Sequence, residues 1–133
     1  MLQLFIHADA QNDLDELWAQ DEDAAAHIEV MLEEIRGDER LLSTLLEHDF
    51  GSYREAGHKY SISKWLHFWN RGQDLWRLKA WELEESGTKL RIVYAYLPSS
   101  AAYHVLAIAP REFNYDPEHP ITRRVLAAYN DLC

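Results

Sequence analysis

Four cationic side chains in the second half of the sequence have spacings that could build one binding site. Arg77 and Lys79 are two residues apart, Arg91 follows on the next predicted strand, and Arg111 comes shortly before Tyr115. A guanidinium is always charged and can bind an oxyanion through two parallel hydrogen bonds. Cations gathered with few carboxylates between them attract anions, and phosphate suits this donor set. The pattern therefore indicates a phosphate-binding site.

The elements that must position these cations are three predicted strands, at residues 75–83, 89–97 and 103–109, joined by turns at 84–87 and 98–101. Side chains alternate between the two faces of a strand, so Arg77 and Lys79 share a face. If neighbouring strands pair as an antiparallel meander, Arg91 joins them and Arg111 and Tyr115 lie at the rim. The same pattern also fits an ordinary exposed sheet face with cross-strand ion pairs, for which the acids are Glu82, Glu84, Glu85 and Glu112.

The first half of the chain is predicted to be helical after a short opening strand at residues 2–6. Apolar residues recur at helical spacing over residues 10–20, 21–36 and 38–48, and a closing helix fits residues 121–132. Residues 50–70 give no clear pattern, although their length favours a further strand or short helix. We therefore expect a single α+β domain over residues 1–133, with the helices on one side of an antiparallel sheet.

Composition narrows the possible functions. The 133 residues are 47% hydrophobic and 27% charged, which is globular composition, and the formal net charge is -10. Residues 1–50 hold 14 Asp/Glu against two Lys/Arg, whereas residues 51–133 hold nine against 11. A uniformly basic nucleic-acid binder is thus excluded, but a local basic patch is not. The single cysteine, Cys133, excludes a disulfide framework and a cysteine zinc cluster. Without a predicted signal peptide or membrane span, we expect a cytoplasmic protein with no membrane association.

A family resemblance is carried by an ordered series of segments in the second half. The segments are Leu75-Trp76-Arg77-Leu78-Lys79, Leu90-Arg91-Ile92-Val93-Tyr94, Val105-Leu106-Ala107-Ile108-Ala109-Pro110-Arg111, and Tyr115. The series resembles the RelE/ParE toxin superfamily, and most of all its RelE and HigB-like ribonuclease branches. It covers about the last 60 residues, and the opening strand and helices agree with that fold in order. The resemblance implies a RelE-like fold and the toxin of a bacterial type II toxin–antitoxin pair.

Such toxins typically cleave messenger RNA, often on the ribosome, and are silenced by a cognate antitoxin. The resemblance thus implies an endoribonuclease whose partners are an antitoxin protein, mRNA and, for some members, the ribosome. The acidic helical half should repel ribosomal RNA, which would restrict any ribosome docking to the sheet side. The tryptophans at 65, 69, 76 and 81 should mainly pack in the core and rim, with room for an exposed patch that an antitoxin covers.

The implied reaction is attack of a ribose 2′-hydroxyl on the adjacent phosphate, which needs a base, charge stabilisation and an acid for the 5′ oxygen. Carried over by position, Arg77, Lys79 and Arg91 would bind the phosphate, and Arg91 and Arg111 would stabilise its developing charge. Lys79 would be the base, because clustered cations lower the pKa of an ammonium. Tyr115 would stack on a base of the RNA. No metal or cofactor is expected.

Two further residues are second-tier candidates for the acid or base. Asp116 and His119 lie close to Tyr115 in sequence, although an exposed loop histidine is usually only solvated. Two other functions remain open on the sequence. One is a ParE-like toxin that inhibits DNA gyrase and cleaves no RNA. The other is a non-catalytic interaction module with the same fold, for which the acidic half would be the working surface.

Overall fold

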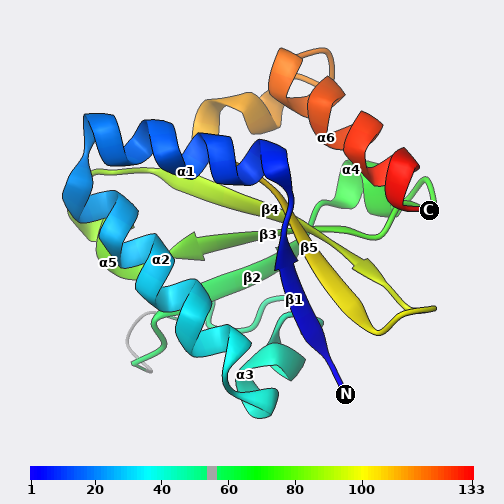
Figure 1. Cartoon of the computed structure of the whole chain (residues 1–133), viewed down its shortest axis with the longest axis horizontal. Helices are drawn as coiled ribbons and strands as arrows, with labels where there is room; N and C mark the ends of the chain where they lie inside the picture. Colours follow the sequence, from blue (N-terminus) through cyan, green and yellow to red (C-terminus); the bar gives the residue numbers. More distant parts are fainter. Residues whose placement is uncertain (54–56) are drawn as a thin grey trace.

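The computed structural model describes residues 1–53 and 57–133, apart from the side chains of residues 114 and 115. It is an α+β domain in which helices cover a five-stranded mixed sheet (Figure 1). The strands are β1 (Gln3–Ile6), β2 (Tyr60–Lys64), β3 (Leu75–Ala80), β4 (Leu90–Leu97) and β5 (Ala102–Pro110). The helices are α1 (Ala8–Gln20), α2 (Glu22–Arg36), α3 (Glu39–Thr44), α4 (Leu66–Trp69), α5 (Trp81–Glu85), the 3-10 turn η2 (Arg111–Tyr115) and α6 (Pro120–Leu132).

The strands lie in the order β1-β5-β4-β3-β2. The strands β3, β4 and β5 form the predicted antiparallel meander. The strand β2 extends it, pairing antiparallel with β3 at the edge of the sheet. The first strand, however, pairs parallel to β5, with Gln3 opposite Ala102, so the prediction of a wholly antiparallel sheet is wrong at this edge. Alternating polarity shows that residues 2–6 form a strand but does not encode its direction. The long helical connection after β1 allows the parallel pairing.

The three N-terminal helices begin where side chains can accept hydrogen bonds from free backbone N–H groups. His7 Nδ1 accepts from the backbone N–H of Asp9, and the carboxylates of Asp21 and Asp38 cap α2 and α3. The apolar stripes of these helices, including Leu14 and Ile28, bury against one face of the sheet. Figure 1 shows α1 and α2 side by side over the strands, in blue.

The opposite face of the sheet has its own apolar core under α4, η2 and α6. It is formed by sheet residues such as Leu75, Val93 and Leu106 together with Phe113 and Val125. The N-terminal helices lie on one face as expected, but α6 packs on the other, so the expectation that the helices lie on one side of the sheet is corrected for α6. The burial of β4 agrees with helices on both faces, because its residues 92 to 95, which point alternately to the two faces, are all buried. A strand buried on both sides must be covered on both sides.

The end of β3 also differs from the prediction. The strand stops at Ala80, and residues 81–85 turn into the helix α5, whereas the sequence predicts a strand over residues 75–83. The helix-forming acids Glu82, Glu84 and Glu85 occupy this turn, and only Leu83 of the helix is buried. One buried leucine fits the strand and helix periods equally well, which explains the error. The change brings Glu84 back toward β4.

A partly buried ion pair links α6 to α1. Asp13 Oδ1 and Oδ2 accept hydrogen bonds from Nη1 and Nη2 of Arg124 at 3.0 and 2.6 Å. Asp13 Oδ2 also accepts from the backbone N–H of Ile108, just beyond a bulge at which β5 changes register. Asp13 therefore satisfies a strand N–H that β1 is too short to reach. None of the helices in the described part of the chain has both the length and the apolar composition needed to span a bilayer.

Candidate functional site

An open hollow of about 370 Å³ lies over one end of the sheet face that carries α6. Three of its lining residues, Arg77, Lys79 and Arg91, are the cations expected to converge, and that predicted convergence is confirmed. The other lining residues are polar, namely Ser61 and Ser63 from β2 and Asp49 and Ser52 from the loop before it. The hollow is thus a cationic floor with small polar walls.

The strand register explains why these residues meet. Ser61 lies opposite Lys79 and Ser63 lies opposite Arg77 in the β2–β3 ladder. Leu78 lies opposite Ile92 in the β3–β4 ladder, so the next position brings Lys79 beside Arg91 on the same face. The short serine side chains on the edge strand leave the space above the cations open. The floor of the site is therefore set by backbone pairing and not by mobile loops.

Arg111 joins the same face from β5 as it turns into η2. Arg91 pairs with Ala109, and the backbone N–H of Arg111 donates to the carbonyl of Lys89 at 3.0 Å, which continues the ladder by one more position. The Nε of Arg111 is buried and makes no hydrogen bond among the residues that the structure describes. A buried guanidinium N–H without an acceptor costs free energy.

The electrostatics of the hollow act on Lys79. Its pKa is lowered first by burial, next by the charge of Arg91, and then by Arg111 and Arg77, against an opposing effect from Glu84. The sequence predicts the effect of the neighbouring cations, and the structure adds burial as the larger cause. The Lys79 ammonium also lies 4.5 Å from the centre of the Trp81 ring, which favours the charged form. Burial and the neighbouring arginines outweigh the effects that favour the charged form, so the pKa of Lys79 is lowered overall and its ammonium loses a proton more easily than usual.

Arg91 has a partner that sequence reasoning placed in another role. Its Nη1 forms an ion pair with Glu84 Oε1, and the two side chains are only 13% and 14% exposed. The same Nη1 donates to the carbonyl of Leu90 at 2.9 Å. The sequence suggests Glu84 only as one of several acids for cross-strand pairing. Its helical context in α5, which could have shown that it faces β4, was not predicted.

Trp65 forms the boundary between this cationic end and the apolar core under α6. Its buried ring packs edge-on against Phe68 and Phe113. The guanidinium carbon of Arg77 lies 6.0 Å from the centre of the same ring. Trp65 and Trp76 are buried, as the sequence predicts for the tryptophans as a group. The indole of Trp81 donates to the carbonyl of Gly51 at 2.7 Å and holds the loop beside the hollow.

The remaining candidate residues follow Arg111 in the sequence. The backbone of Tyr115 ends η2, but its side chain is outside the described part of the structure, so its predicted position over the site stays a prediction. Asp116 accepts a hydrogen bond from the backbone N–H of Glu118, and His119 Nδ1 accepts from Ile121 at the start of α6. The His119 side chain thus caps α6 and the Asp116 side chain stabilises the turn before it, and neither residue is among those that line the hollow.

A larger hollow of about 640 Å³ lies between α2 and α5, but its chemistry does not suit an anion. Its polar lining combines the acids Glu34, Glu82 and Glu85 with His27 and Lys59. Among residues 1–53 and 57–133 no group of three or more His, Cys, Asp or Glu side chains is placed to hold a metal ion. No family model, curated protein or solved structure matches this chain. The functional argument therefore rests on the cationic hollow.

Proposed function

We propose that the protein is an endoribonuclease that cleaves RNA through attack of the ribose 2′-hydroxyl on the adjacent phosphate, and that it acts as the toxin of a toxin–antitoxin pair. The observation that carries the proposal is the cationic hollow, in which Arg77, Lys79 and Arg91 share one open sheet face and Arg111 continues it. These are the positions at which the sequence resembles RelE-like ribonucleases. The partners on this proposal are RNA, whether or not it is on a ribosome, and a cognate antitoxin protein.

The chemistry needs little beyond what the hollow supplies. The nucleophile is the substrate's own 2′-hydroxyl, so no nucleophilic side chain is required. Negative charge develops on the phosphoryl oxygens, and Arg91 and Arg111 are suited to stabilise it with charged donors that are already in place. Arg77 adds attraction for the neighbouring phosphate. Lys79, with its lowered pKa, is suited to proton transfer. Tyr115 would stack on a base of the splayed strand.

The charge distribution favours an approach of RNA from the sheet side. The N-terminal helices carry most of the acid excess, and they cover the opposite face of the sheet from the hollow. A polyanion is repelled by the helical face and attracted to the hollow, so the field of the whole molecule would orient it. This orientation is consistent with a net charge of -10, because only one local surface has to be basic.

The experiment is induced expression in a bacterial host, followed by measurement of growth and mapping of new mRNA 5′ ends. The wild type is compared with an Arg91→Ala/Arg111→Ala double variant. We expect growth arrest and discrete RNA cleavages for the wild type, and the loss of both for the double variant. With purified protein and a defined RNA, the product should end in a 2′,3′-cyclic phosphate, which identifies 2′-hydroxyl attack.

The matched control is Arg40→Ala, which removes an arginine on α3 whose side chain is 85% exposed and far from the hollow in the fold. It should cleave RNA like the wild type. Growth arrest without RNA cleavage, accompanied by induction of the DNA-damage response, would point to a gyrase-directed toxin. A folded protein that causes neither effect would favour a non-catalytic interaction module. Either result would overturn the nuclease proposal.

A further inference from the structure

A carboxylate, that of Glu84, is in contact with an arginine of the cationic site, although a phosphate-binding site has no use for it in ground-state binding. Glu84 lies on the short helix α5 and forms an ion pair with Arg91, and both side chains are largely removed from water. A carboxylate beside a phosphate-binding arginine weakens anion binding by repulsion and by occupying a donor. Its position therefore needs a reason other than affinity for the phosphate.

The surroundings of Glu84 distinguish it from the other acids of its helix. From β3 it faces Lys79, whose charge it affects, from β4 it faces Arg91, and Arg111 contributes to the same group of cations around Lys79. Glu82 on the same helix is 78% exposed and its carboxylate lies 3.5 Å from His27 of α2 instead. Glu85 borders the hollow between α2 and α5. Glu84 is thus the acid of α5 that is in direct contact with the proposed site.

We infer that Glu84 is the general base that takes the proton of the 2′-hydroxyl, and that Lys79 is the general acid that protonates the 5′ oxygen. This inference rests on the proposed ribonuclease function. As the 2′ oxygen forms its bond to phosphorus, its proton moves to a carboxylate oxygen of Glu84. The bond between phosphorus and the 5′ oxygen breaks, and the leaving oxygen takes a proton from the Lys79 ammonium. The products are a 2′,3′-cyclic phosphate and a 5′-hydroxyl, and water later restores both protonation states.

This assignment uses each group in its ordinary charge state. A glutamate is ionised at neutral pH and can accept a proton at once, whereas a lysine must first lose one. Burial and the neighbouring arginines lower the pKa of Lys79, which makes its ammonium a stronger acid. A carboxylate and an ammonium held close together in one site can serve as an acid–base pair. Arg91, bound to Glu84 before RNA arrives, would hold the carboxylate beside the phosphate that it also binds.

The first test compares Glu84→Gln with Glu82→Gln, a matched change on the exposed side of the same helix. Single-turnover cleavage of a defined RNA at saturating enzyme separates the chemical step from binding. Removal of a general base should lower the rate by roughly 10²- to 10⁴-fold, with RNA binding unchanged or tighter. Glu82→Gln should cleave at the wild-type rate, and Glu84→Asp should recover part of the loss.

The second test uses an RNA whose 5′-bridging oxygen is replaced by sulfur, a leaving group that needs no protonation. Lys79→Arg should be slow on normal RNA and close to the wild type on the sulfur substrate, while Glu84→Gln should stay slow on both. On normal RNA the wild-type rate should fall in alkaline solution as Lys79 loses its proton. A rate that instead rises through the alkaline range would make Lys79 the base and overturn the assignment.

The outcomes separate this assignment from the ribonuclease proposal. An active wild type with a fully active Glu84→Gln would refute the role of Glu84 and leave the nuclease intact. A faster Glu84→Gln would also refute it, because the acid would then only mask Arg91. A folded wild type that cleaves no RNA would remove both conclusions together. Circular dichroism of each variant shows that a lost rate does not reflect a lost fold.

Discussion

The two ends of one sheet face differ sharply although the same strands form both. Toward α6, Leu75 on β3 and Val93 on β4 are fully buried. Two residues along each strand, Arg77 and Arg91 lie on the same face in the open hollow. The strand period is the same at both ends, so alternation alone cannot produce the difference. The difference is made by what covers each end.

Trp65, α4 and α6 cover the apolar end, while small serines and a loop leave the cationic end open. The covered end contributes to stability by burying apolar area, and the open end gathers like charges that repel one another. The comparison indicates a division of roles within a single face. Stability is supplied by one end, and the other holds a group of like charges whose repulsion a bound anion would reduce.

The most severe way to break the comparison is to place a cation in the covered end. Val93→Lys would bury an ammonium where Val93 is 0% exposed and is surrounded by apolar residues. An unpaired buried charge is among the largest single destabilising effects, so we expect a loss of about 4 kcal/mol or more, or failure to fold. Urea unfolding followed by circular dichroism measures the loss.

The matched change at the open end is Ser63→Lys, which adds the same side chain beside Arg77 on the same face. Here the ammonium can reach water, so the cost should be about 1 kcal/mol or less, mainly from repulsion between cations. Equal losses for Val93→Lys and Ser63→Lys would show that the two ends do not differ in the way described.

A second break targets the contact that holds α6 over the covered end. Asp13→Ala would leave Arg124 without its bidentate partner and the backbone N–H of Ile108 without an acceptor. Because Arg124 is 32% exposed and Asp13 14%, the loss of this pair and of the acceptor for Ile108 should cost about 1–3 kcal/mol in the free energy of unfolding. Amide exchange should speed up in α6 and at Ile108 before other regions.

The control is Arg123→Ala, the next residue of α6, whose ion pair with Glu118 is exposed on both sides. An exposed pair contributes little, so its loss should change stability by about 0.5 kcal/mol or less. If Asp13→Ala were as mild as Arg123→Ala, the pair could not be what fixes α6.

The sequence predicts the α+β class and the three strands of the meander because their alternating and helical periods are long and clear. The predictions are wrong where the local sequence pattern fits more than one structure equally well. The parallel pairing of Gln3–Ile6 depends on a crossover that alternation does not encode, and α5 follows a single buried residue, Leu83. Residues 60–63 of Tyr60–Lys64 do alternate between apolar and polar types, but the run is too short for the sequence to distinguish a strand from irregular structure there.

The same distinction applies to the candidate site. Convergence of Arg77, Lys79 and Arg91 could be predicted, because residues on paired strands meet wherever the register is regular. The ion pair of Arg91 with Glu84 could not, because it depends on a helix that the sequence pattern presented as a turn. The capping role of His119 was also hidden, since a histidine at the start of a helix looks like any loop histidine until Pro120 is known to begin the helix.

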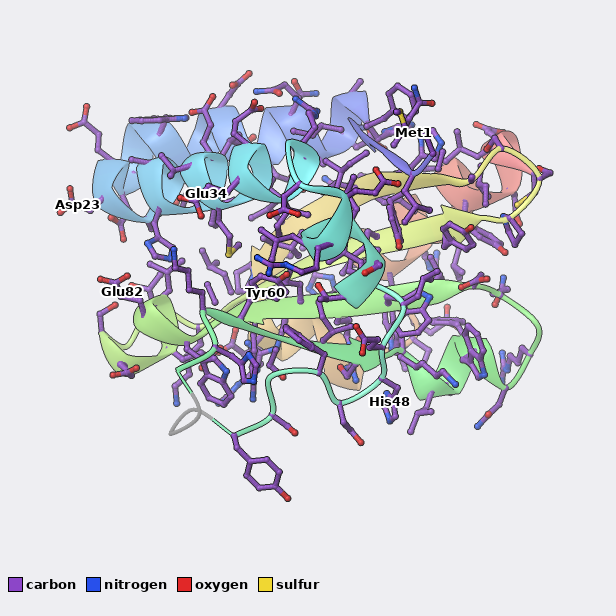
Figure 2. The ribbon with its side chains drawn as sticks, turned by 90° about the horizontal axis from the view of Figure 1, so that it is seen from below. Met1, Asp23, Glu34, His48, Tyr60 and Glu82 are labelled. Atoms are coloured by element: carbon purple, nitrogen blue, oxygen red, sulfur yellow. The ribbon has the colours of Figure 1, made fainter. Side chains whose placement is uncertain are left out.

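A third, smaller prediction concerns three tyrosines on the opposite face of the same strands, which make the stability of the fold depend on pH. Tyr94 lies between Val93 and Ala95 but points toward α3, where its hydroxyl donates to the carbonyl of Leu45, and Tyr103 donates to Leu42. Tyr60, also on this face, shares a hydrogen bond with Thr44 and lies between the N-terminal helices and the sheet (Figure 2). Burial is the main cause that raises the pKa of all three hydroxyls.

A raised folded pKa means that these tyrosines stay protonated in the folded state while the unfolded chain ionises near pH 10. Their stabilising effect is complete below pH 10 and is lost as pH rises toward the folded values. The free energy of unfolding should fall by up to about 1.4 kcal/mol per pH unit for each tyrosine. Tyr94→Phe should make this alkaline slope shallower while costing about 1 kcal/mol at neutral pH. An unchanged slope would contradict the burial argument.

The smallest expected effect is the most direct test of the division of roles. Lys79→Met keeps an unbranched side chain over Trp81 but removes a charge that burial and three arginines disfavour, as the lowered pKa of Lys79 indicates. We expect this variant to be more stable at neutral pH by a few tenths of a kcal/mol, up to about 1 kcal/mol, because water screens much of the repulsion. Calorimetry should show a Tm raised by a few degrees at most.

The direction of the stability change in Lys79→Met can be checked by varying pH and salt. A lysine with a lowered folded pKa disfavours the folded state until it loses its proton, so wild-type stability should recover relative to Lys79→Met as pH rises from the lowered pKa toward 10.5. Added salt should narrow the gap at neutral pH. The exposed Lys89→Met, one position before β4, should gain nothing. A Lys79→Met protein that is less stable than the wild type would mean that Glu84 and Trp81 outweigh the arginines. The cationic end would then contribute to stability like the covered one.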